Sequence, residues 1–146
     1  MPHLTAQFNA SGPILDILIG VSDPRRRLLL ANGIDVPPAQ RLSLILDTGA
    51  ETTMVNEQFM RTLALPVRGQ RDILTATSDE RPTACNTYDV SLQISTYGDP
   101  PFTLPALEVI GRPLFNHSID GMVGRDVLSR LKLTIDGPRR TFRLDY

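Results

Sequence analysis

Short apolar runs separated by turn residues dominate the pattern of hydrophobic and polar positions along the chain. Runs that predict strands occupy residues 4–8, 14–19, 42–46, 72–77, 87–96, 102–110, 133–136 and 141–144. Proline, glycine and Asn-Gly or Asp-Gly pairs lie between many of these runs, and such residues favour turns between strands. The pattern therefore predicts a mostly β fold.

Two short segments have helical spacing instead. Asn56 can cap a helix in which Phe59 and Leu63 share one face, and Pro66 follows its end. Residues 125–131 carry three apolar side chains at helical spacing. We therefore expect one or two short helices within the β fold.

Turn-forming residues and proline predict three further local features. Residues 72–95 predict a hairpin with a polar, solvated tip at residues 78–82. Pro105 predicts an edge strand or a bulge, because proline cannot donate to a β-ladder. The Asp-Gly pair at residues 120–121 predicts a turn.

Composition and charge narrow the class of protein. A chain of 146 residues with 41% hydrophobic side chains suits a single domain, over residues 1–146, with its own core. The formal net charge of −1 provides no broad field that would attract nucleic acid or anionic lipid. Three consecutive arginines at residues 25–27 are interpreted as a solvated loop, with a nucleic-acid contact as the less favoured alternative.

Cysteine and histidine content gives no sign of a disulfide or a metal site. Cys85 is the only cysteine, and we interpret it as a packed side chain rather than a redox switch. His3 and His117 cannot complete a zinc site with one cysteine unless carboxylates help, so no metal or cofactor is expected. We interpret His117 as a loop residue.

The sequence also lacks the patterns of export and membrane insertion. Its N-terminus has no charged region followed by an apolar one, and no apolar run approaches the roughly 20 residues that span a bilayer. We therefore expect a soluble, cytoplasmic chain without a membrane span. Whether it is a whole protein or a domain cut from a larger one stays open.

The segment with the clearest chemistry is Leu-Ile-Leu-Asp-Thr-Gly-Ala at residues 44–50. An apolar strand there delivers the Asp47 carboxylate at its buried end. Gly49 lets the backbone turn sharply and approach a substrate, and the Thr48 hydroxyl can bond to a backbone group or to its counterpart in a second chain. An unpaired ionised carboxylate is costly in an apolar site, so Asp47 requires a partner.

Asp-Thr-Gly alone is also compatible with a plain strand-to-turn connection, since all three residues favour turns. A second segment decides between the two interpretations. Met-Val-Gly-Arg-Asp-Val-Leu at residues 122–128 together with residues 44–50 resembles the two signatures of retropepsin-like aspartic proteases. The intervening hairpin sits where such proteases carry a flap, and the resemblance extends from about Leu42 to Leu144.

The resemblance implies a closed acid-protease β-barrel with a flap hairpin and an aspartic endopeptidase activity. Asp47 would be the catalytic residue, and a water held between two carboxylates that share one proton would attack the peptide bond. This chain has one Asp-Thr-Gly, so the second carboxylate would be Asp47 of another copy in a symmetric homodimer. The C-terminal hairpin at residues 131–146 is the best candidate for the dimer contact, and a peptide or protein is the expected substrate.

Supporting roles also follow from the resemblance. It assigns support of the active-site loop to Thr48, Gly49, Ala50, Glu51, Gly124 and Arg125. It assigns substrate contacts of the flap to Thr77, Ser78, Asp79 and Glu80. We expect Glu51 and Arg125 to form a buried or semi-buried ion pair that braces the loop. An ordinary surface position for Arg125 is the alternative, although a cation at a helix start argues mildly for a specific partner.

One departure from the family keeps other functions open. Viral flaps are glycine-rich at the tip, whereas residues 78–82 contain no glycine. A dimeric peptide-binding scaffold with weak or absent catalysis is therefore the alternative function. A domain of a larger regulatory or membrane protein, released by self-cleavage, is a third. The retained Asp47 favours the protease.

Overall fold

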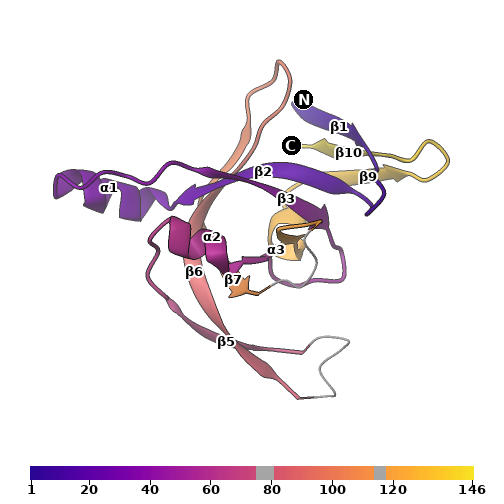
Figure 1. Ribbon diagram of the computed structural model, residues 1–146. Helices are drawn as coiled ribbons and strands as arrows, with labels where there is room; N and C mark the ends of the chain where they lie inside the picture. Colours follow the sequence, from indigo (N-terminus) through magenta and orange to yellow (C-terminus); the bar gives the residue numbers. More distant parts are fainter. Residues whose placement is uncertain (75–80, 114–117) are drawn as a thin grey trace.

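The computed structural model describes residues 1–74, 81–113 and 118–146 of the chain. The described elements are β1 (His3–Gln7), β2 (Ile14–Val21), α1 (Asp23–Ala31), β3 (Gln40–Leu46), β4 (Met54–Asn56), α2 (Glu57–Thr62), β5 (Gly69–Ile73), β6 (Thr83–Ile94), β7 (Phe102–Arg112), β8 (Gly121–Val123), α3 (Arg125–Leu128), β9 (Lys132–Asp136) and β10 (Thr141–Asp145). The fold is mostly β, as the sequence predicts (Figure 1).

Six strands close into a barrel. Neighbouring strands pair in the cyclic order β2, β3, β8, β4, β7, β6 and back to β2. The β3–β8 and β4–β7 pairs are parallel and the others antiparallel. Every strand in the ring therefore has a hydrogen-bonded neighbour on each side for at least part of its length, which confirms the predicted closed β-barrel.

Alternation along the strands fills the barrel. Leu42, Leu44 and Leu46 of β3 are buried, and the side chains between them are partly exposed, as expected for period-two patterning. Every second residue of β6 from Val90 to Ile94 is likewise fully buried. This packing makes β3 a firm support for the residue that follows it, Asp47.

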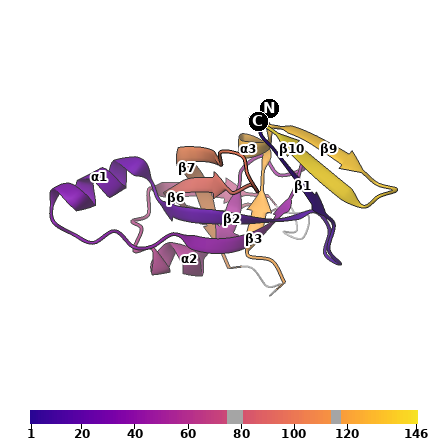
Figure 2. The ribbon, with the colours of Figure 1, turned by 90° about the horizontal axis from the view of Figure 1, so that it is seen from above.

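A second sheet joins the two ends of the chain. β10 pairs antiparallel with β1 on one side and β9 on the other. Phe142 and Leu144 of β10 belong to the core cluster, which ties this sheet to the barrel. Figures 1 and 2 show the termini close together and the β9–β10 hairpin extending past the barrel. The C-terminal hairpin is therefore formed as predicted.

The β5–β6 hairpin projects from the opposite end of the barrel (Figure 1). β5 is displaced towards the N-terminus relative to the predicted strand at residues 72–77, and β6 starts before the predicted residue 87. The proposed flap residues Thr77, Ser78, Asp79 and Glu80 lie outside the described residues, as does His117.

Three local expectations are resolved by the structure. Residues 25–27 lie within α1 rather than in a loop; Pro24 at the helix start and Asp23 in its first turn favour that helix. Pro105 lies beside a register shift in the β6–β7 pairing, so the predicted bulge is confirmed. Among the described strands, this part of β7 pairs with β6 alone, because β4 pairs only with Ile110, Gly111 and Arg112. Gly121 begins β8 instead of closing a turn, because the β4 backbone packs against its Cα.

Candidate active site

Asp47 follows the last residue of β3 and is half-buried. Its backbone N–H donates to the carbonyl oxygen of Val123 at 3.0 Å, so the parallel strand β8 holds the start of the loop. Its Oδ1 accepts a hydrogen bond from the Gly49 N–H at 2.8 Å. A Cβ at Gly49 would lie 3.1 Å from this oxygen, so glycine leaves room for the carboxylate to sit over the turn.

The two sequence motifs meet in space. The Arg125 N–H donates to the Ala50 carbonyl oxygen at 2.9 Å, and Arg125 Nη1 donates to the carbonyl oxygens of Thr48 and Gly49 at 3.1 and 3.3 Å. Gly124 is buried against the preceding loop, where an added Cβ would approach the Thr52 carbonyl carbon to 2.6 Å. Glycine at this position therefore allows the close approach of the two loops.

The expected Glu51–Arg125 ion pair is wrong. Both side chains are exposed, and neither residue takes part in an ion pair within the described part of the chain. The guanidinium of Arg125 donates to loop carbonyls instead. Glu51 faces α3 with its backbone, whose carbonyl oxygen accepts from the Asp126 N–H at 3.2 Å. Arg125 thus braces the loop through carbonyl dipoles rather than through a carboxylate.

Asp126 is the carboxylate that joins the two loops. Its Oδ2 accepts from the Thr53 N–H at 2.9 Å, and its Oδ1 accepts from the Thr53 hydroxyl at 2.7 Å and the Val127 N–H at 2.9 Å. Thr53 is fully buried, and its Oγ1 also accepts from the Gly124 N–H at 3.1 Å. The sequence shows an acid in the first turn of a short helix, but nothing in its spacing indicates Thr53 as the partner.

A cavity of about 460 Å³ adjoins this loop. Residues 49–52 form one wall, residues 71–74 of the β5 side form another, and Met54, Ile110 and Arg125 complete it. Thr48 and Gly49 are exposed, whereas Asp47 is half-buried and is not among the residues that line this cavity. The cavity combines apolar side chains with charged ones and lies directly under the start of the hairpin.

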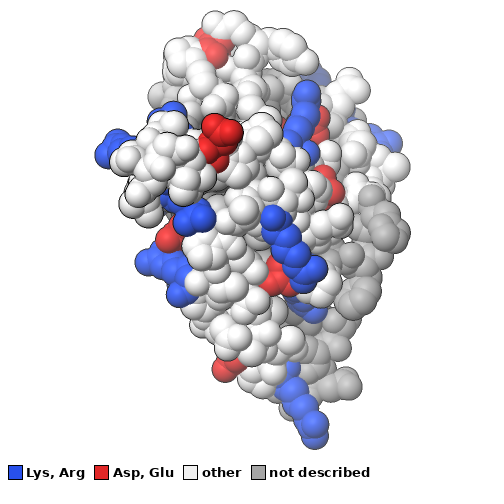
Figure 3. Space-filling model, turned by 60° about the vertical axis from the view of Figure 1, so that its left-hand side comes forward, with Lys and Arg blue, Asp and Glu red and all other residues white. Residues whose placement is uncertain are grey.

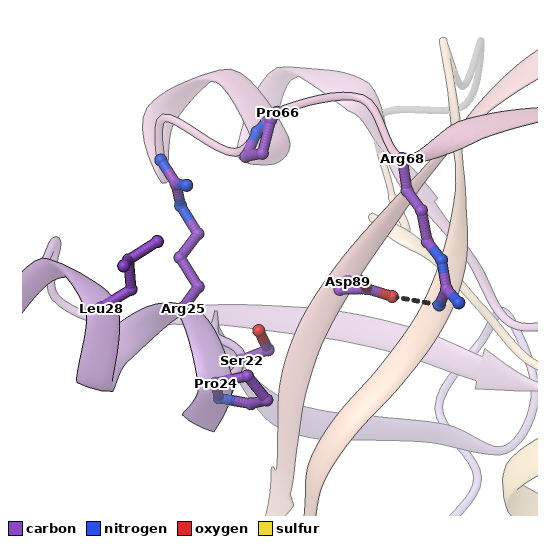
Figure 4. A pocket seen from close by; sticks show the side chains of 7 residues that line it. All are labelled: Ser22, Pro24, Arg25, Leu28, Pro66, Arg68 and Asp89. Atoms are coloured by element: carbon purple, nitrogen blue, oxygen red, sulfur yellow. Dashed lines mark hydrogen bonds and ion pairs between the residues drawn. The ribbon is translucent and has the colours of Figure 1, made fainter.

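Figure 4 shows a different pocket, of about 390 Å³, between α1 and the segment after α2. Arg68 and Asp89 meet there at 2.6 Å, and Arg25, Leu28 and Pro66 lie around it. No residue of the Asp47 loop lines this pocket, so it is separate from the candidate active site. On the face drawn in Figure 3, acidic and basic side chains are interspersed without a patch of one sign.

The described residues contain neither a cluster of metal ligands nor a membrane-spanning helix. No group of three or more histidine, cysteine, aspartate or glutamate side chains there is arranged to hold a metal ion. No helix in the same part of the chain is long and apolar enough to span a membrane.

Comparison with known proteins identifies the fold. No protein-family model matches the sequence, and no curated protein matches it significantly. Among solved structures, a retropepsin-like aspartic protease from Rickettsia conorii aligns over 99% of this chain and 91% of its own, with a TM-score of 0.63 and 15% identity. The retroviral protease-like domain of Ddi1 from Leishmania major aligns over 91% and 93%, with a TM-score of 0.42 and 13% identity. The first match shows that this chain has the retropepsin-like fold.

Proposed function

We propose that the chain is one subunit of a homodimeric aspartic endopeptidase, with Asp47 of each copy supplying half of the catalytic pair. The observation that carries the proposal is the Asp47 loop, held by Gly124 and Arg125, in a chain with the retropepsin-like fold. The sequence contains one Asp-Thr-Gly, so the second carboxylate comes from another copy. Asp47 is only half-buried and adjoins the exposed residues Thr48 and Gly49, which is compatible with such a pairing.

Two carboxylates about 3 Å apart cannot both ionise, so they share one proton. The ionised member accepts a proton from the water between them while that water attacks the peptide carbonyl carbon. The protonated member donates its proton to the carbonyl oxygen. Collapse of the tetrahedral intermediate returns that proton to the same carboxylate, while the other member gives the proton taken from the water to the leaving amine nitrogen. In this chain the Gly49 N–H holds one oxygen of Asp47 at 2.8 Å and so fixes the orientation of the carboxylate.

The terminal sheet offers the surface for the second copy. Among the described strands, β9 pairs with β10 alone, which leaves its outer edge with free backbone donors and acceptors. Ile135 on β9 is 53% exposed. Figure 1 shows this hairpin reaching past the barrel on the side where β3 ends. An isologous contact between two such hairpins would place the same surface on both subunits around a two-fold axis.

The test is the Asp47→Asn variant. Asparagine keeps an oxygen that can accept from Gly49, so the loop is preserved while the acid–base pair is lost. We expect peptide cleavage to fall by roughly 10²–10⁴-fold, the range for general acid–base groups, with dimerisation unchanged. Asp35→Asn is the matched control, because Asp35 is exposed and distant in sequence from the loop. Full activity in Asp47→Asn would exclude the mechanism, and peptide binding without cleavage by the unaltered chain would favour the scaffold alternative.

A further inference from the structure

β5, the outer strand of the β5–β6 hairpin, borders the cavity beside the Asp47 loop and is attached to the barrel through β6. Within the described chain β5 pairs with β6 only, and every β5 residue except Ile73 is exposed. β5 therefore has no buried apolar face of its own to fix it over the cavity. Besides its backbone ladder with β6, polar side chains link it and β6 to neighbouring elements.

Glu57, the first residue of α2, provides one such link. Its side chain is only 18% exposed. The single oxygen Oε1 accepts from the Tyr88 hydroxyl at 2.7 Å and from Asn86 Nδ2 at 3.0 Å, both on β6. Asn86 Oδ1 in turn accepts from Gln70 Nε2 on β5 at 3.3 Å. The chain of hydrogen bonds thus connects both strands of the hairpin to α2.

This link lies behind the hairpin, away from the cavity. Gln70 pairs with Asn86 in the ladder and Arg71 with Cys85, and successive side chains of a strand point to opposite faces. Arg71 lines the active-site cavity, whereas Glu57, Gln70 and Asn86 line a separate pocket of about 460 Å³. The two cavities share no lining residue. Glu57 therefore has no direct access to a substrate in the active-site cavity.

Close packing around the Tyr88 ring supports its hydrogen bond with Glu57. A Cβ at Gly111 would lie 2.6 Å from Tyr88 Cε2, so the absence of a side chain at Gly111 makes room for the ring. The hydrogen bond from Tyr88, followed by that from Asn86 and the charge of Arg61, lowers the pKa of Glu57, although burial acts in the opposite direction. Arg61 lies 3.5 Å from the other carboxylate oxygen. The carboxylate is thus ionised and the bonds that it accepts are charge-assisted.

We propose that Glu57 is a positioning residue that holds the β5–β6 hairpin over the substrate cavity through Tyr88 and Asn86. This role rests on the proposed protease function. A second link supports the hairpin from β7, where Arg71 lies 2.6 Å from Glu108 and Arg68 lies 3.4 Å from it. Loss of Glu57 therefore loosens the hairpin without releasing it from the barrel.

Two substitutions separate the hydrogen bonds from the rest of the side chain. Glu57→Gln keeps the oxygen that accepts from both β6 donors, and Glu57→Ala removes it. We expect Glu57→Ala to raise KM for a peptide substrate roughly tenfold, as the loss of charge-assisted hydrogen bonds implies, with kcat within about twofold of the unaltered chain. Glu57→Gln should restore KM to within about threefold. Gln58→Ala, on the exposed face of the same helix, is the control.

Hydrogen exchange of the peptide-free protein tests the link without relying on activity. Glu57→Ala should speed amide exchange at residues 69–73 and 83–88 and leave β3 unchanged, and Tyr88→Phe should do the same more weakly. Unchanged exchange in the hairpin would overturn the proposal even for an active enzyme, as would equal acceleration throughout the barrel or a fall in kcat at constant KM. If the unaltered chain cleaves no peptide but the hairpin loosens in Glu57→Ala, the proteolytic function fails while the link itself stands.

Discussion

Replacement of Asp126 tests whether this carboxylate, rather than Glu51, joins the two loops of the candidate active site. Asp126 accepts two hydrogen bonds from the fully buried Thr53, at 2.7 and 2.9 Å. A hydrogen bond to a charged group contributes about 1.5–3 kcal/mol, and the lower end applies because Asp126 is half-buried. Asp126→Ala should therefore lower the free energy of unfolding by about 3 kcal/mol. For a domain of this size that corresponds to a fall in Tm of roughly 10 °C.

The matched comparison is Glu51→Ala. Glu51 is exposed and makes no ion pair within the described residues, so its removal should change the free energy of unfolding by less than about 0.5 kcal/mol. Asp126→Asn should fall between the two, at about 1–2 kcal/mol, because one carboxylate oxygen becomes an NH₂ group that cannot accept from Thr53.

Urea unfolding followed by circular dichroism measures all three variants, at one protein concentration because dimerisation makes stability concentration-dependent. If Glu51→Ala destabilises the protein as much as Asp126→Ala, the carboxylate has been assigned to the wrong residue. If neither substitution has an effect, the loops are not held together by a carboxylate at all.

Two further predictions concern the same loop and the link behind the hairpin. Gly124→Ala should destabilise the chain by about 1–3 kcal/mol, because the added Cβ overpacks against Thr52. Gly137→Ala is the control and should be tolerated, because an added Cβ there meets nothing within 4 Å. Equal Tm values for the two variants would contradict the close approach of the two loops at Gly124. Hydrogen bonds from Tyr88 and Asn86 and the charge of Arg61 lower the pKa of Glu57 in the folded protein below its unfolded value of about 4.5. Ionised Glu57 therefore stabilises the fold above about pH 4.5, and this stabilisation is lost as the pH falls through the lower folded pKa. Urea titrations at a series of acidic pH values should show that the free energy of unfolding falls less steeply with pH in Glu57→Gln than in the unaltered chain. Parallel curves for the two proteins would contradict this role of the Glu57 carboxylate.

Most strands and the Asp47 loop could be predicted from sequence because their signals are local, whereas closure into a barrel was implied by the resemblance to retropepsin-like proteases. The apolar run at residues 42–46 predicts β3, and glycine, arginine and a short helix mark the loop that contacts the residues after it. α1 was not predicted from the sequence, and the reason is physical. None of its residues is buried, so it has no apolar stripe for a periodicity to reveal.

The sequence also did not show which side chains contact one another across the fold. Glu51 and Asp126 are both acidic and both adjoin a signature motif, and only the packed geometry shows that Thr53 faces Asp126. The Glu57–Tyr88 contact joins α2 to β6, and no local pattern encodes such a long-range pairing. The register shift beside Pro105 likewise becomes visible only in the pairing of β6 with β7.

The central claim is that one active site takes Asp47 from two copies of the chain. Mixing the unaltered chain with an equal amount of Asp47→Asn chain, under conditions that allow subunits to exchange, tests it most directly. Size-exclusion chromatography first establishes that both forms dimerise. If mixed dimers are inactive, cleavage per unaltered chain should fall to about half, and it should fall further as the variant is added in excess. Cleavage per unaltered chain that stays constant at every mixing ratio would contradict the shared site.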